Sequence, residues 1–171
     1  ITVNSTLGEV YLSAGAEILQ NNASAVITAG KLSAVTTGGG VGLNEANMVD
    51  VIAGNAVTGF GFTNNKSLTI GTVNGVNGID VTVGALSLPN AYISVTANNG
   101  SLTISQPVSA RGSYGGAASV SLSGDAITVF NLVNNALSAG RGIAVSSNST
   151  IALGVPLVGV IDHPALDIRV N

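Results

Sequence analysis

Ser-Leu-Thr-Ile at residues 67–70 recurs at residues 101–104, and this repeated stretch decides the fold. In each copy apolar and polar residues alternate, which is typical of a β-strand with one buried face. A turn rich in Gly and Asn follows the first copy at residues 71–78, and a Val-x-Val strand comes next at 81–83. Strands this short are not stable alone, so the pattern predicts that copies stack on one another.

The same alternation returns along the chain at intervals of roughly 16 to 27 residues, which lies in the range of solenoid repeats. Asn-Gly steps at 74–75, 77–78 and 99–100 supply turns that need a positive φ. We therefore expect a right-handed parallel β-helix, a β-solenoid. The alternative is an antiparallel β-sandwich, which also shows short alternating strands. Only 4% of the residues are aromatic, and this favours a narrow stacked interior over a sandwich core.

Composition limits the classes of partner. Of the 171 residues 46% are apolar and 8% are charged, and the net charge is −3. The five cations are scattered, so we expect no nucleic acid as a partner. No apolar run reaches the ~18 residues of a membrane helix, so we also expect no membrane span. Cysteine is absent, and a chain without disulfides must be held by packing or stacking.

The domain prediction is one solenoid segment over residues 1–171, forming part of a longer array. Residues 44–58 interrupt the alternation with Glu45, Met48 and neighbouring apolar residues. We expect this stretch to leave the solenoid as an excursion loop.

Residues 67–79 and 101–110 resemble interior repeats of filamentous-haemagglutinin-like exoproteins, and the resemblance in rhythm and composition covers about residues 60–155. It implies a long right-handed β-helical needle, exported by two-partner secretion across a Gram-negative outer membrane. The Asn-Pro-Asn-Gly tetrapeptide of the family's secretion domain is absent, so that domain is not placed here. The family's stalk repeats carry no catalytic residues, so none transfers to this chain.

The expected function is therefore a non-enzymatic stalk segment of an extracellular bacterial adhesin or other large surface or secreted protein. Its expected partners are adjoining repeats or further copies at open solenoid ends, and glycans or proteins of a host or neighbouring cell. Two alternatives remain. In one the chain is a filament subunit that donates residues 1–7 to a neighbouring sheet. In the other it is a carbohydrate-active β-helix.

Candidate catalytic and metal-binding residues are few. His163 precedes a proline and is interpreted as a turn residue, because no activated serine context accompanies it. Asp80 and Asp125 are the pair that a carbohydrate-active protein would use. Residues 39–44 resemble a single calcium nonapeptide, and one copy does not complete an oxygen cage. We expect no catalytic residue, metal or cofactor.

Five Asn-x-Ser/Thr sequons are candidate glycosylation sites, because such sequences can carry sugar on the asparagine. They begin at Asn4, Asn22, Asn65, Asn99 and Asn148.

Overall fold

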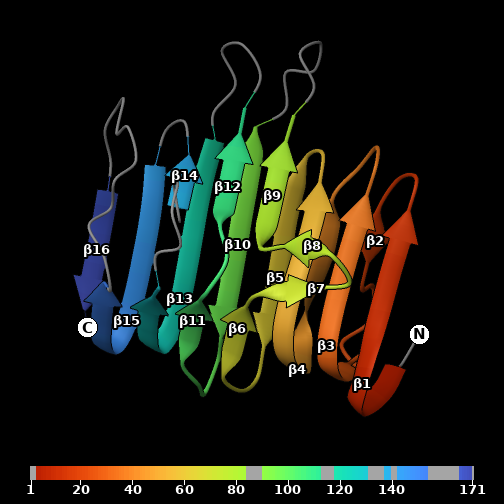
Figure 1. The fold of residues 1–171 in the computed structure, drawn as a ribbon, viewed down its shortest axis with the longest axis horizontal. Coiled ribbons are helices and arrows are strands. Elements are labelled where there is room, and N and C mark those ends of the chain that lie inside the picture. The colour runs from red at the N-terminus through yellow and green to blue at the C-terminus, as the bar shows by residue number, and fades with distance from the viewer. Residues whose placement is uncertain are drawn as a thin grey trace.

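The computed structural model describes residues 3–83, 90–112, 118–130, 137–139, 142–153 and 166–170. Within these ranges the regular structure is all β, with no helix (Figure 1). The strands are β1 (Val3–Ala14), β2 (Ile18–Leu19), β3 (Ile27–Thr36), β4 (Val41–Ala56), β5 (Gly59–Asn64), β6 (Leu68–Ile70), β7 (Thr72–Val73), β8 (Val76–Asn77), β9 (Ile79–Thr82), β10 (Ala91–Ala97), β11 (Leu102–Ile104), β12 (Val108–Arg111), β13 (Ala118–Val129), β14 (Leu137–Ala139), β15 (Gly142–Leu153) and β16 (Leu166–Val170).

Fourteen of these strands form one sheet, and every pairing within it in the described residues is parallel. The antiparallel β-sandwich, which was the alternative prediction, is therefore not the arrangement of these strands. Parallel neighbours need long connections, since a two-residue hairpin can join only antiparallel strands. Figure 1 shows the result, in which chain order runs along the long axis from β1 to β16.

One ladder shows how the chain returns to itself. Its members pair in succession: Val10, Leu32, Ile52, Ile70, Ile104, Val129 and Leu153. The interval is 18 residues from Ile52 to Ile70 and 34 residues from Ile70 to Ile104, so the predicted 16 to 27 residues hold for most intervals and not for the longest. The long interval contains the antiparallel hairpin β7–β8, which Figure 1 shows lying across the other strands.

The core consists of stacked apolar columns. Leu68, Leu102 and Ile127 occupy equivalent positions on three parallel strands, and each is at most 2% exposed. Like side chains stack because parallel pairing in register puts equivalent positions about 4.8 Å apart. The two aromatic rings of the core, Phe60 and Phe62, lie on β5 and are also fully buried.

The predicted excursion at residues 44–58 is wrong for residues 44–56. These residues belong to β4, which pairs with β5 near its start, with β3 and β6 in its middle and with β9 at its end. The pairing of β4 changes at buried Asn47, since residues up to Asn47 pair with β5 and Val51 and Ile52 pair with β6. We call such a place a bend of the ladder. That inward asparagine disturbs the apolar alternation without ending the strand. Within the described residues, residues 72–77 lie outside the parallel sheet as the antiparallel pair β7–β8.

Candidate functional site

Two fully buried asparagines mark the bends of the ladder. Asn47 and Asn64 are parallel neighbours on β4 and β5, and each is 0% exposed. Buried amides cost free energy unless their donors and acceptors are paired. We therefore identified the hydrogen-bond partners of both side chains.

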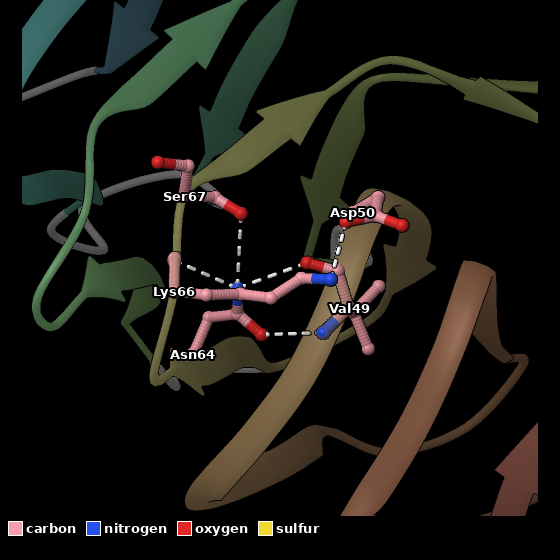
Figure 2. Close-up of polar contacts among 5 residues, drawn as sticks. All are labelled: Val49, Asp50, Asn64, Lys66 and Ser67. Atoms are coloured by element: carbon pink, nitrogen blue, oxygen red, sulfur yellow. Dashed lines mark hydrogen bonds and ion pairs between the residues drawn. The ribbon is translucent and has the colours of Figure 1, made fainter. Parts of the chain in front are cut away.

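Asn64 pairs its side chain with the backbone of Val49 (Figure 2). The Val49 N–H donates to Oδ1 of Asn64 at 2.8 Å, and Nδ2 of Asn64 donates to the Val49 carbonyl at 2.9 Å. Nδ2 also donates to the carbonyls of Lys66, at 2.9 Å, and of Ser67. A single side chain thus gives Val49 the two hydrogen bonds that a neighbouring strand would give.

The Asn47 side chain likewise forms hydrogen bonds with backbone groups at the preceding bend. Its Oδ1 accepts from the Ile27 N–H at 2.9 Å, and its Nδ2 donates to the carbonyls of Leu43 and Thr63 at 3.0 and 3.1 Å. Gln20 completes the set by donating to Oδ1 and accepting from Nδ2. Both asparagines are therefore saturated by the protein, and we assign them a structural role.

A second row of polar side chains lies just outside these bends. Its members are Asn65, Asn99, Asp125 and Asn148, which lie on or beside four neighbouring parallel strands, β5, β10, β13 and β15. They line an open groove of about 300 Å³ together with Ala97, Asn98, Ser123 and Gly124. We call this the amide groove.

The side chains of the amide groove pair only in part. Asn99 Nδ2 donates to Asn65 Oδ1 at 2.8 Å, and Asn148 Nδ2 donates to Asp125 Oδ1 at 3.0 Å. Within the described residues, no protein partner binds the Asn65 amide hydrogens, Asn99 Oδ1, the second oxygen of Asp125 or Asn148 Oδ1. The groove therefore presents both hydrogen-bond donors and hydrogen-bond acceptors to a ligand.

The electrostatics of the groove are simple. Asp125 is the one charged side chain among the residues that line it. The nearby Lys66 ammonium is paired with Asp50, as Figure 2 shows. An anion would meet an uncompensated carboxylate, and a multivalent cation would find only one formal charge to hold it.

Another hollow, of about 680 Å³, lies near β2 and is lined by Ala16, Glu17, Leu19, Asn21, Gly38, Gly39 and Thr58. It contains the start of the calcium-like stretch at residues 39–44. Only Glu17 supplies a carboxylate there, and in the described part of the chain no three acidic or histidine side chains are grouped as metal ligands.

The structure gathers three of the five sequon asparagines, namely Asn65, Asn99 and Asn148, at the amide groove. Asn22 is exposed elsewhere, and its Oδ1 accepts from the Ser24 N–H at 2.8 Å. The backbone of Asn4 belongs to β1. Glycosylation of these five residues stays a prediction.

The paired carboxylates of the carbohydrate-active alternative lie on different ladders. Asp80 is on β9, beside Ser109 of β12, and its carboxylate accepts from the Thr82 hydroxyl at 2.8 Å and lies 3.8 Å from Arg111. Asp125 lies at the bend of β13, in the amide groove. His163 falls outside the described residues.

Sequence reasoning missed the amide groove as a site, although a signal for it is visible. Asn doublets at 64–65 and 98–99 stand at the ends of equivalent alternating stretches, and Asp125 stands at the end of the next such stretch, within β13. Ser123 carries no comparable signal, because serine is frequent throughout the chain.

Comparison of the chain with protein-family models, curated proteins and solved structures finds no match. None of the described elements is a helix with the length and apolar character to cross a bilayer.

Proposed function

We propose that the chain is a right-handed parallel β-helix that serves as a non-enzymatic stalk segment of a large bacterial surface or secreted protein. The observation that supports it best is the uninterrupted parallel ladder from Val10 to Leu153. The resemblance to filamentous-haemagglutinin-like exoproteins, carried by residues 67–79 and 101–110, suggests the extracellular location and the two-partner secretion route.

Stiffness follows from this arrangement. Each repeat buries apolar side chains against the repeats on either side, and the hydrogen bonds between strands run along the stack. Six steps between paired strands at about 4.8 Å make roughly 29 Å of continuous core. Bending such a rod would open several apolar columns together, so it can hold a binding tip away from a surface.

The ends of the stack suggest the partner of the stalk itself. In the described residues β1 pairs with β3 alone, and β16 pairs with β15 alone. Each therefore offers unpaired backbone groups on one edge, which a further strand can pair. We propose that adjoining repeats or a second copy extend the ladder there.

Solution scattering and diffraction test the architecture. Small-angle X-ray scattering of the purified chain should give an elongated particle of constant cross-section. An aligned film should give a reflection near 4.8 Å along the long axis, because the strands lie across it. A spherical particle, or that reflection perpendicular to the long axis, would contradict the rod.

Surface labelling tests the role. Antibodies against this segment should label intact cells that produce the whole protein, since a stalk lies outside the outer membrane. A cytoplasmic protein measured in the same cells is the control for lysis. Labelling that requires permeabilised cells would refute the extracellular stalk while leaving the β-helix untouched.

A further inference from the structure

We infer that the amide groove of the unglycosylated chain binds a neutral polyhydroxylated ligand, an uncharged oligosaccharide, with Asn65, Asn99, Asp125 and Asn148 as its contacts. This inference requires only the observed ladder and groove, and it holds whether or not the chain is a stalk. Several incompletely bonded polar side chains converge there on one hollow.

The unpaired hydrogen-bond donors and acceptors of the groove indicate the class of ligand. Asn65 offers two amide hydrogens, whereas Asn99, Asp125 and Asn148 each offer an oxygen with no protein donor among the described residues. A ligand for this row must both donate and accept hydrogen bonds. Sugar hydroxyls do both at every position, and a site built for such hydroxyls rejects molecules that lack them.

The spacing of the row suits an extended ligand. Its residues lie on or beside four neighbouring parallel strands, so the row runs for roughly 14 Å at the separation of parallel strands. Two hydrogen bonds within the row hold Asn65 to Asn99 and Asn148 to Asp125. These contacts orient the side chains beforehand, which lowers the entropic cost of binding.

Charge excludes the competing ligands. Calcium takes six to eight oxygen ligands, usually with several carboxylates, and Asp125 is the one carboxylate lining the groove. A phosphate or an acidic sugar would approach Asp125 without a compensating cation, because Lys66 is paired with Asp50. A neutral ligand needs neither additional carboxylates nor a compensating cation.

The test uses the isotope-labelled chain and its asparagine side-chain amide resonances. Cellohexaose, xylohexaose and maltohexaose are the neutral probes, and calcium chloride and inorganic phosphate are the charged ones. At least one neutral probe should shift the Asn65, Asn99 and Asn148 amides together. The exposed Asn55 of β4 should not shift, because it lies on the ladder of β9.

Variants complete the test. The double variant Asn99→Ala/Asn148→Ala should weaken binding at least tenfold, with an unchanged far-ultraviolet circular dichroism spectrum. Asn55→Ala should leave binding unchanged, and Asp125→Asn should keep it within about threefold, since the amide retains an acceptor oxygen. Absence of shifts with every neutral probe, shifts with calcium alone, or equal loss in Asn55→Ala would overturn the inference.

Discussion

The Phe60 ring fills the space that a side chain at Gly54 would need. A Cβ built on Gly54 would lie 2.2 Å from Cε2 of Phe60 and 2.6 Å from the carbonyl oxygen of Ala34. Phe60 is 0% exposed, so its ring cannot move into solvent to make room for the added atom. The glycine of β4 and the aromatic ring of β5 are thus a matched pair within the core.

Gly54→Ala should therefore destabilise the protein by about 1–3 kcal/mol, the usual cost of overpacking a core. The matched control is Gly59→Ala, whose Cβ would meet the ring of Tyr92. Tyr92 is 47% exposed and can swing into solvent, so we expect a change below about 1 kcal/mol. Chemical denaturation of both variants measures the difference. Equal losses would contradict the predicted difference in freedom between the Phe60 and Tyr92 rings.

Asn64→Ala should remove the two hydrogen bonds that the Asn64 side chain makes with the backbone of Val49. The variant leaves buried backbone groups without a partner, at a cost of about 1–3 kcal/mol for each. We expect a loss of at least about 2 kcal/mol in the free energy of unfolding. Asn65→Ala, at the exposed neighbour, should change it by less than about 0.5 kcal/mol. A stable Asn64→Ala variant would mean that water replaces the amide.

The hairpin β7–β8 offers a test of backbone conformation alone. Gly75 has φ of 76° and its preceding Asn74 has φ of 49°, as a tight Asn-Gly turn requires. A Cβ at Gly75 would meet no atom within 4 Å, and the same is true at Gly15, which has no positive φ. Gly75→Ala should cost about 1–2 kcal/mol and Gly15→Ala close to none. Thermal unfolding of the two variants compares them, and indistinguishable melting temperatures would refute the argument.

Glu9 supplies a pH-dependent prediction. Hydrogen bonds from Lys31, at 2.7 Å, and from Tyr11 hold the pKa of the Glu9 carboxyl below its usual value. A folded-state pKa below the unfolded one stabilises the fold above the unfolded pKa, and this contribution is lost as the pH falls through the folded pKa. Lys31→Ala should raise the pKa of Glu9, as followed by its side-chain carboxyl resonance. Lys66→Ala, which alters the pair with Asp50, should leave it unchanged.

Strands β6 and β11 were predictable because their signal is local. At Ser67–Ile70 and 101–104 an inward Leu and Ile flank an outward Thr, and β6 and β11 follow there in parallel register. The turn at Asn74 was predictable for the same reason, since the need for positive φ concerns only adjacent residues. The misjudged stretch was β4, where buried Asn47 resembles an exposed residue until its partners Ile27, Leu43 and Thr63 are known.

The amide groove was not predictable as a whole, although three of its asparagines were singled out individually. Asn65 and Asn99 are 34 residues apart in the sequence, and their 2.8 Å contact depends on the length of everything between them. That interval includes the β7–β8 hairpin, and no local pattern fixes how such an insertion is accommodated.

The sequence by itself determined the all-β character, the stacking of like residues and the positions of several turns, because alternation and turn chemistry act between near neighbours. The tertiary structure alone decided which strands pair, that β4 continues through Asn47, and that Asn65, Asn99, Asp125 and Asn148 share one groove. The physical reason is register: the contacts between neighbouring parallel strands depend on how many residues separate them in the chain, and that number varies from one pair to the next.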